Sequence, residues 1–331
     1  VALVAATARA STARPRQRIL VSTVVVAVLL ALALPELWQT AASVRDWDSS
    51  RFVLDEIAAP STGRVPYGDY APQYSALLGL PLVPVVVAIP GSAPSVVLTW
   101  LVALQVLAIV VAVALVARSG GSRYVGLVSL VIVAPCIATT PQGYSPTTYF
   151  ASLPIRVLLP ILTIAGAYAV LRRRPRRWIP LHVGLGLLAG AAVVNNPDFG
   201  GPVLGALLLV VAFLREPGRR RLGSIGLVLL GAVGAALLYA LWAWERGAPV
   251  SPDFTLVFQQ VFGAAGYFNV EMPATGLHVA VVCLFVSATV IGLALVRRFD
   301  GGTWLGRQGL VLALAGSWSV LSLGYYVGRS L

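Results

Sequence analysis

The chain has 331 residues, of which 58% are hydrophobic and only 11% charged, and its formal net charge is +12. Because a soluble domain is typically about 25% charged, this composition excludes a globule covered by a water-facing surface. All 24 basic residues are arginines, clustered in short segments between apolar stretches, which is the pattern of membrane topology and not of nucleic-acid binding. The two cysteines, Cys136 and Cys283, lie in apolar segments and have no metal-site spacing.

Nine apolar segments predict transmembrane helices, because most approach the roughly 20 residues that cross a bilayer as a helix. In chain order they are 19–38, 94–117, 123–140, 150–171, 178–194, 200–214, 222–244, 276–296 and 304–323. A further apolar stretch, 74–90, is interrupted by Pro81, Pro84 and Pro90. We therefore expect an all-α, polytopic integral membrane protein with a single transmembrane domain over 1–331. The sequence lacks an initial Met and stops abruptly, so we expect a fragment that is truncated at its C-terminus.

The arginines assign the two faces of the membrane. Arg14, Arg16 and Arg18 precede the first span, so the N-terminus is expected in the cytoplasm. The later Arg-rich loops should lie on the same side; they are 118–123, 172–177, 215–221 and 297–298. If 74–90 crossed the membrane, all of these loops would fall outside. We therefore predict that 74–90 is an interfacial or re-entrant helix in the first outer loop, 39–93, of a plasma-membrane protein.

The acidic residues, which barely influence orientation, then gather on one face. Ten of the twelve fall outside, most of them in or near the loops 39–93 and 245–275: Glu36, Asp46, Asp48, Asp55, Glu56, Asp69, Asp198, Glu245, Asp253 and Glu271. Glu216 and Asp300 fall inside. This distribution indicates either chemistry or cation binding at the outer face, or acids that fill loops from which arginine is excluded.

The first outer loop mixes carboxylates with aromatic and amide side chains just above the membrane. The set comprises Asp46, Asp48, Tyr67, Asp69, Tyr70 and Gln73. A carboxylate at a lipid–water boundary is a candidate general base, which favours a functional role for the three aspartates. The aromatic side chains either stack on a sugar or anchor the loop at the interface, and taken alone they favour the anchoring role.

The order of these features resembles the start of the GT-C superfamily of glycosyltransferases that use lipid-linked sugars. A span is followed by an outer loop with an early Asp, then by Gly63-x-x-Pro66-Tyr67-x-Asp69, then by a Pro-containing apolar helix. The composition of a GC-rich genome adds a likeness to actinobacterial cell-wall arabinosyl- and mannosyltransferases. The resemblance implies a polyprenyl-phosphate sugar as donor and Asp46 or Asp48 as general base. Asp46 is preferred because it comes first after the span, and Asp69 would orient the acceptor or bind a metal.

Five further residues are candidates for binding the substrate. Arg156 lies inside a predicted span, where an unpartnered arginine costs about 2.5 kcal/mol or more. It is either a ligand for the donor phosphate or the structural partner of an outer carboxylate. Asn195 and Asn196, in a tight polar turn, need hydrogen-bond partners so close to lipid. His278 and Arg329, each near the outer end of a span, are phosphate candidates whose alternatives are a structural histidine and a snorkelling arginine.

The leading hypothesis is a GT-C-type glycosyltransferase whose active site faces outward. Its partners would be a polyprenyl-phosphate sugar, a glycan or lipid acceptor and membrane lipids, but no nucleic acid. Nothing in the sequence demands a cofactor, although the first outer loop offers oxygen ligands for a divalent cation. The alternatives are a transporter or flippase for a lipid-linked or anionic substrate, and a non-catalytic membrane protein. A transporter should place polar groups in the middle of several spans, which here are almost free of them.

Overall fold

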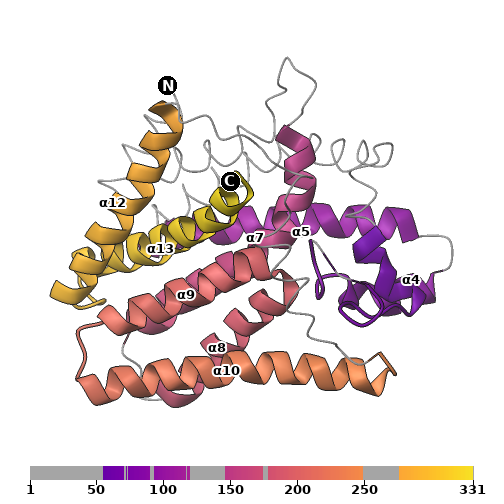
Figure 1. Cartoon of the computed structure of the whole chain (residues 1–331), viewed down its shortest axis with the longest axis horizontal. Helices are drawn as coiled ribbons and strands as arrows, with labels where there is room; N and C mark the ends of the chain where they lie inside the picture. Colours follow the sequence, from indigo (N-terminus) through magenta and orange to yellow (C-terminus); the bar gives the residue numbers. More distant parts are fainter. Residues whose placement is uncertain are drawn as a thin grey trace, which may run out of the picture. The chain divides into compact units, whose positions relative to one another are not determined.

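The structure is a computed structural model that describes residues 55–70, 72, 74–89, 93–116, 118–119, 146–173, 178–248 and 276–330. The elements in these segments are all helices, in agreement with the predicted fold class (Figure 1). In chain order they are η2 (Ala59–Thr62), η3 (Leu80–Leu82), α4 (Val83–Ala88), α5 (Ala93–Val116), α7 (Pro146–Leu171), α8 (Trp178–Asn195), α9 (Pro197–Phe213), α10 (Gly218–Glu245), α12 (Gly276–Arg298) and α13 (Trp304–Ser330).

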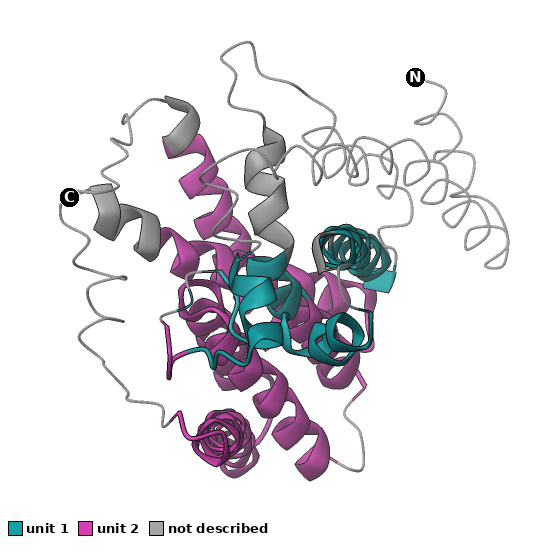
Figure 2. Ribbon diagram, turned by 90° about the vertical axis from the view of Figure 1, so that its right-hand side faces the viewer, with its two compact units in different colours: residues 1–66, 72–161 teal, residues 67–71, 162–331 magenta. Residues whose placement is uncertain are grey.

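The chain groups into two compact units (Figure 2). Unit 1 comprises residues 1–66 and 72–161, and unit 2 comprises residues 67–71 and 162–331. The boundary between them falls inside α7. Five residues from the first predicted outer loop, 67–71, therefore belong to the same unit as α8, α9 and α10.

Four of the described helices are long and apolar enough to cross a membrane. They are Ser95–Val116, Trp178–Asn195, Gly218–Glu245 and Val279–Arg298, which correspond to four of the predicted spans. The apolar parts of α7 and α9 are shorter, Ile155–Leu171 and Pro197–Phe213. A helix also covers the predicted span 304–323. The predicted spans 19–38 and 123–140 lie outside the described residues, so the count of nine spans stays a prediction.

Segment 74–89 does not form a full-length span. After a series of turns it forms η3 and then α4, which together extend about 15 Å, against roughly 30 Å for the apolar core of a bilayer. A proline is the second residue of each helix, because a proline is tolerated in a first turn but breaks a helix interior. The indole nitrogen of Trp100 in α5 donates a 2.7 Å hydrogen bond to the Leu78 carbonyl and ties this segment to α5. The helical part of this segment is therefore shorter than a membrane span, and its interfacial or re-entrant placement stays a prediction.

In unit 2 the helices pack in the succession α10, α8, α9, α13 and α12 (Figure 1). Glycines bring the backbones of α8 and α10 into contact: a Cβ at Gly186 would meet the Val228 carbonyl, and one at Gly231 would meet the Val183 carbonyl. Gly190 lies four residues after Gly186, and a Cβ there would meet the backbone of Ala232. Small residues at this spacing are typical of helix packing in lipid, where close backbone contact replaces the hydrophobic driving force.

Glycines also bring the backbones of α12 and α13 into close contact. Gly292 of α12 faces the backbone of Ala313, and Gly316 of α13 faces that of Thr289. Helix α9 joins this pair to α8, and the Trp318 indole nitrogen donates a 3.1 Å hydrogen bond to the Phe199 carbonyl of α9. The sequence analysis did not single out these glycines.

The outer helices of unit 2 expose large apolar side chains that a water-soluble protein would bury. On α10, Leu230 is 62% exposed and Leu237 64%; on α12, Leu284 is 63% exposed and Val290 61%. Continuous apolar faces of this kind fit contact with the acyl chains of a membrane. They support the membrane assignment through packing as well as through composition.

The glycine contacts predict a specific loss of stability. We expect Gly186→Ala to lower the free energy of unfolding by about 1–3 kcal/mol, because the added methyl meets the α10 backbone, which cannot rotate away. Gly184→Ala is the matched control on the same helix, since nothing lies within 4 Å of its added methyl. It should be neutral or stabilising by up to about 1 kcal/mol. Unfolding in detergent, followed by circular dichroism, measures both; equal stabilities would contradict this packing.

Candidate functional site

In unit 1 the candidate site is centred on Arg156. Its guanidinium carbon lies 4.1 Å from the centroid of the Tyr74 ring, a cation–π contact between α7 and the first predicted outer loop. The neighbouring Ile155 and Leu158 on the same helix are fully buried. An apolar helix thus carries one half-buried cation, which an aromatic ring holds in place.

The Nε atom of Arg156 is buried and has no hydrogen-bond partner among the described residues. A buried donor left in this state costs about 1–3 kcal/mol, so such groups in native proteins call for an explanation. A ring stacked on the face of a guanidinium leaves the N–H groups in its plane free to bind an anion. Phosphate and carboxylate match that edge in a bidentate manner. Arg156 is therefore suited to hold an anionic group.

Glu56 positions the ring on which Arg156 stacks. Its Oε2 accepts hydrogen bonds from the backbone N–H groups of Tyr74, at 2.7 Å, and Ser75, at 3.1 Å. The Ser75 hydroxyl in turn accepts the N–H of Leu78 at 3.1 Å and closes the next turn. Hydrogen bonds to a charged acceptor are about twice as strong as neutral ones. Glu56 thus fixes the turn that presents Tyr74 to Arg156.

In unit 2 a second cluster forms around Tyr67. Its hydroxyl donates a 2.9 Å hydrogen bond to the Val194 carbonyl at the end of α8, and its ring meets Tyr239 of α10 edge-on, with centroids 6.1 Å apart. The backbone of Tyr67 has φ +60°, and its N–H donates to the Tyr70 carbonyl at 2.7 Å. A non-glycine residue in this region is uncommon and is held there by its surroundings. Residues 67–70 therefore pack against the end of α8.

Tyr239 continues this cluster along one face of α10. Its ring lies 5.5 Å from that of Trp242, and the Arg246 guanidinium carbon lies 4.8 Å from the Trp242 ring centroid. The spacing of three and four residues places these side chains on one helical face. These side chains carry no distinctive signal in the sequence, because they lie in or directly after an apolar span, where aromatic residues are common.

Asn195 and Asn196 lie beside this cluster, and both side chains are buried. The Asn196 Oδ1 accepts the N–H of Phe199 at 3.2 Å and caps the first turn of α9. The turn that it caps therefore accounts for Asn196. Asn195 directly follows Val194, whose carbonyl receives the Tyr67 hydroxyl.

The predicted site residues fall into three groups. Arg156 lies in unit 1, whereas Tyr67, Asp69, Tyr70, Asn195 and Asn196 lie in unit 2. Asp69 is exposed at the tip of its turn. Asp46, Asp48 and Gln73 lie outside the described residues, as do the side chains of His278 and Arg329, so their roles stay predictions. Within the part of the chain that the structure describes, no group of three or more His, Cys, Asp or Glu side chains is placed to hold a metal ion.

Removing the Glu56 carboxylate tests its positioning role. We expect Glu56→Ala to lower the free energy of unfolding by about 2 kcal/mol or more, because two backbone N–H groups lose a charged acceptor. Asp55→Ala is the matched control, since it removes a neighbouring carboxylate whose residue is exposed. Thermal unfolding and limited proteolysis near residue 74 are the measurements. Equal behaviour of the two variants would exclude this role of Glu56.

The chain was also compared with known proteins. No family model, curated protein or solved structure matches it. The function must therefore be inferred from the residues themselves and from their arrangement.

Proposed function

We propose that the chain is a membrane glycosyltransferase of the GT-C type. It transfers a sugar from a polyprenyl-phosphate donor to a cell-envelope acceptor at the outer face of the plasma membrane. The observation that carries this proposal is Arg156, a half-buried cation on an apolar helix with an unpartnered Nε among the described residues. A cation at such a place is a functional candidate by default, because an apolar side chain would be less costly there.

The chemistry requires a positive charge where the leaving phosphate develops negative charge. In the proposed reaction Asp46 or Asp48 takes the proton of the acceptor hydroxyl, whose oxygen attacks the anomeric carbon of the sugar. The bond from that carbon to the phosphate oxygen breaks, and polyprenyl phosphate leaves with the electron pair. Arg156 stabilises the departing phosphate, and a fixed donor acts more strongly in a site of low dielectric constant than in water. Tyr74 and Glu56 hold that donor in place.

The positions of the arginine loops bear on the orientation of unit 2. The loops after α7, α9 and α12 meet at one end of unit 2: Arg215 donates to the Arg298 carbonyl at 3.4 Å, and Gly301 lies against Arg172. Segment 67–71 contacts the opposite ends of α8 and α10. If the arginine end faces the cytoplasm, the end with Tyr67 and Asp69 faces outward.

Substitution of Arg156 tests the proposal. We expect Arg156→Gln to lower sugar transfer by about 100-fold or more, because a preorganised donor to the leaving group is removed. Arg173→Gln is the matched control, as it removes an exposed charge in the turn after the same helix. The assay supplies membranes with radiolabelled polyprenyl-phosphate sugars. Undiminished transfer by Arg156→Gln would exclude this role, and wild-type uptake of label without transfer would favour a transporter or flippase.

The aspartates of the first outer loop form a separate series. We expect Asp46→Asn to abolish transfer if Asp46 is the base, Asp48→Asn to do so if Asp48 is, and Asp69→Asn to cause a smaller loss. An amide cannot take up the proton of the acceptor hydroxyl, so the true base should show the largest fall in kcat. If all three variants retain wild-type kcat, the first outer loop does not hold the catalytic base.

A further inference from the structure

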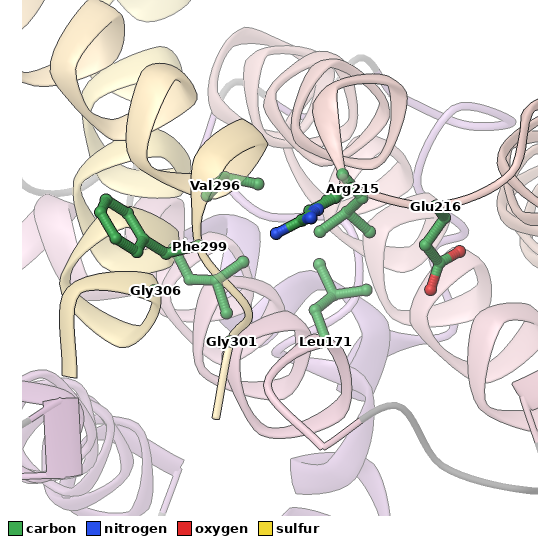
Figure 3. Close-up of a pocket in the computed structure, with 9 residues that line it drawn as sticks. Leu171, Arg215, Glu216, Val296, Phe299, Gly301 and Gly306 are labelled. Atoms are coloured by element: carbon green, nitrogen blue, oxygen red, sulfur yellow. The ribbon is translucent and has the colours of Figure 1, made fainter. Parts of the chain in front are cut away.

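The end of unit 2 opposite Tyr67 forms a cleft between three loops (Figure 3). Residues from the ends of α7, α9 and α12 and from the start of α13 line it. Figure 3 shows the Arg215 guanidinium extending toward Phe299 and Val296, whereas the Glu216 carboxylate points away from it. A cation therefore reaches into the cleft.

Positive charge predominates around this cleft. The described arginines of this end, which we call the arginine end, are Arg172, Arg173, Arg215, Arg219, Arg220, Arg221, Arg297, Arg298 and Arg307. Among the described residues of the arginine end, the acids are Glu216 and Asp300. Glu216 is engaged by Arg220, at 3.6 Å on the next helical turn. The carboxylates present thus cannot neutralise most of these arginines.

Some arginines of the arginine end contact aromatic rings through cation–π interactions. The guanidinium carbon of Arg172 lies 5.1 Å from the centroid of the Tyr168 ring, and that of Arg298 lies 5.8 Å from the centroid of the Phe299 ring. Stacking uses the face of the guanidinium and leaves its N–H edge for an anion. The buried Nε atoms of Arg172, Arg221 and Arg307 have no hydrogen-bond partner among the described residues. Among the described residues, an unused N–H donor therefore remains on an arginine directly after α7, near the start of α10 and near the start of α13.

Exposed apolar side chains border the arginine end. Phe213, Leu222 and Trp304 are 41%, 71% and 49% exposed, and Ile179 is 53% exposed. A soluble phosphate has nothing to cover these side chains, whereas the acyl chains of a lipid do. The combination of a cationic cleft and an apolar border selects a lipid as its occupant.

We propose that the arginine end binds the phosphate headgroup of an anionic phospholipid, with the acyl chains lying on the apolar border. Attraction between clustered arginines and anionic headgroups is a known component of membrane-protein electrostatics. Here the three loops would be bridged by one headgroup, which would tie α7, α9 and α12 together at this end. The inference does not depend on the proposed sugar transfer.

The test measures lipid binding to the purified full chain in zwitterionic detergent. Bound phosphatidylglycerol and phosphatidylcholine are quantified by native mass spectrometry for the wild type and for an Arg215→Gln, Arg298→Gln double variant. We expect the wild type to bind phosphatidylglycerol at least tenfold more tightly than phosphatidylcholine, and the double variant to lose about tenfold in that affinity. Both substituted residues are exposed, so the core is unchanged, and circular dichroism checks the fold.

Arg246→Gln is the matched control, because it removes an aromatic-stacked arginine at the other end of unit 2. It should bind phosphatidylglycerol as the wild type does. Equal losses in the control and in the double variant would overturn the proposal, and so would equal binding of the two lipids. Displacement of phosphatidylglycerol by an equal concentration of inorganic phosphate would also overturn it, since the cleft would then recognise a free anion.

Discussion

The constraint on which the structure depends is that backbone polar groups in lipid must be paired within the protein. Helices meet that requirement, but they then lack the hydrophobic force that joins helices in water. Glycines at the α8–α10 and α12–α13 contacts compensate by letting backbones touch. The large side chains are turned outward instead, as Leu237 and Leu284 show. The close glycine contacts and the apolar outer surface are thus both explained by a lipid environment.

The same constraint makes each buried polar group in an apolar helix informative. Arg156 departs from the surrounding pattern, and a ring and a carboxylate from the first predicted outer loop support it. Asn196, by contrast, is accounted for by the cap it provides. The hydrogen bond of Asn196 therefore indicates a structural role, whereas the unpartnered Nε of Arg156 among the described residues leaves a donor for a ligand.

Composition and helix-length patterns were sufficient to predict helices, because these depend on local hydropathy. The interruption of 74–90 was also predictable, since prolines and loop charges both point to it. The surroundings of Arg156 were not, because Tyr74 lies far from it in sequence and meets it only through tertiary packing, and Glu56 acts on Arg156 only by fixing the turn that carries Tyr74. The Tyr67 contact with Val194 was not predictable for the same reason. The face formed by Tyr239 and Trp242 was not predictable because aromatic residues are common in an apolar span.

The central claim is that the arginine end and the Tyr67 end of unit 2 face opposite sides of a membrane. Cysteines placed one at a time, in a background without Cys136 and Cys283, test it most directly. With a membrane-impermeant maleimide on intact cells, Asp69→Cys and Glu245→Cys should be labelled, whereas Arg173→Cys and Arg219→Cys should be labelled only after permeabilisation. Labelling of all four in intact cells, or the reverse order, would contradict the account.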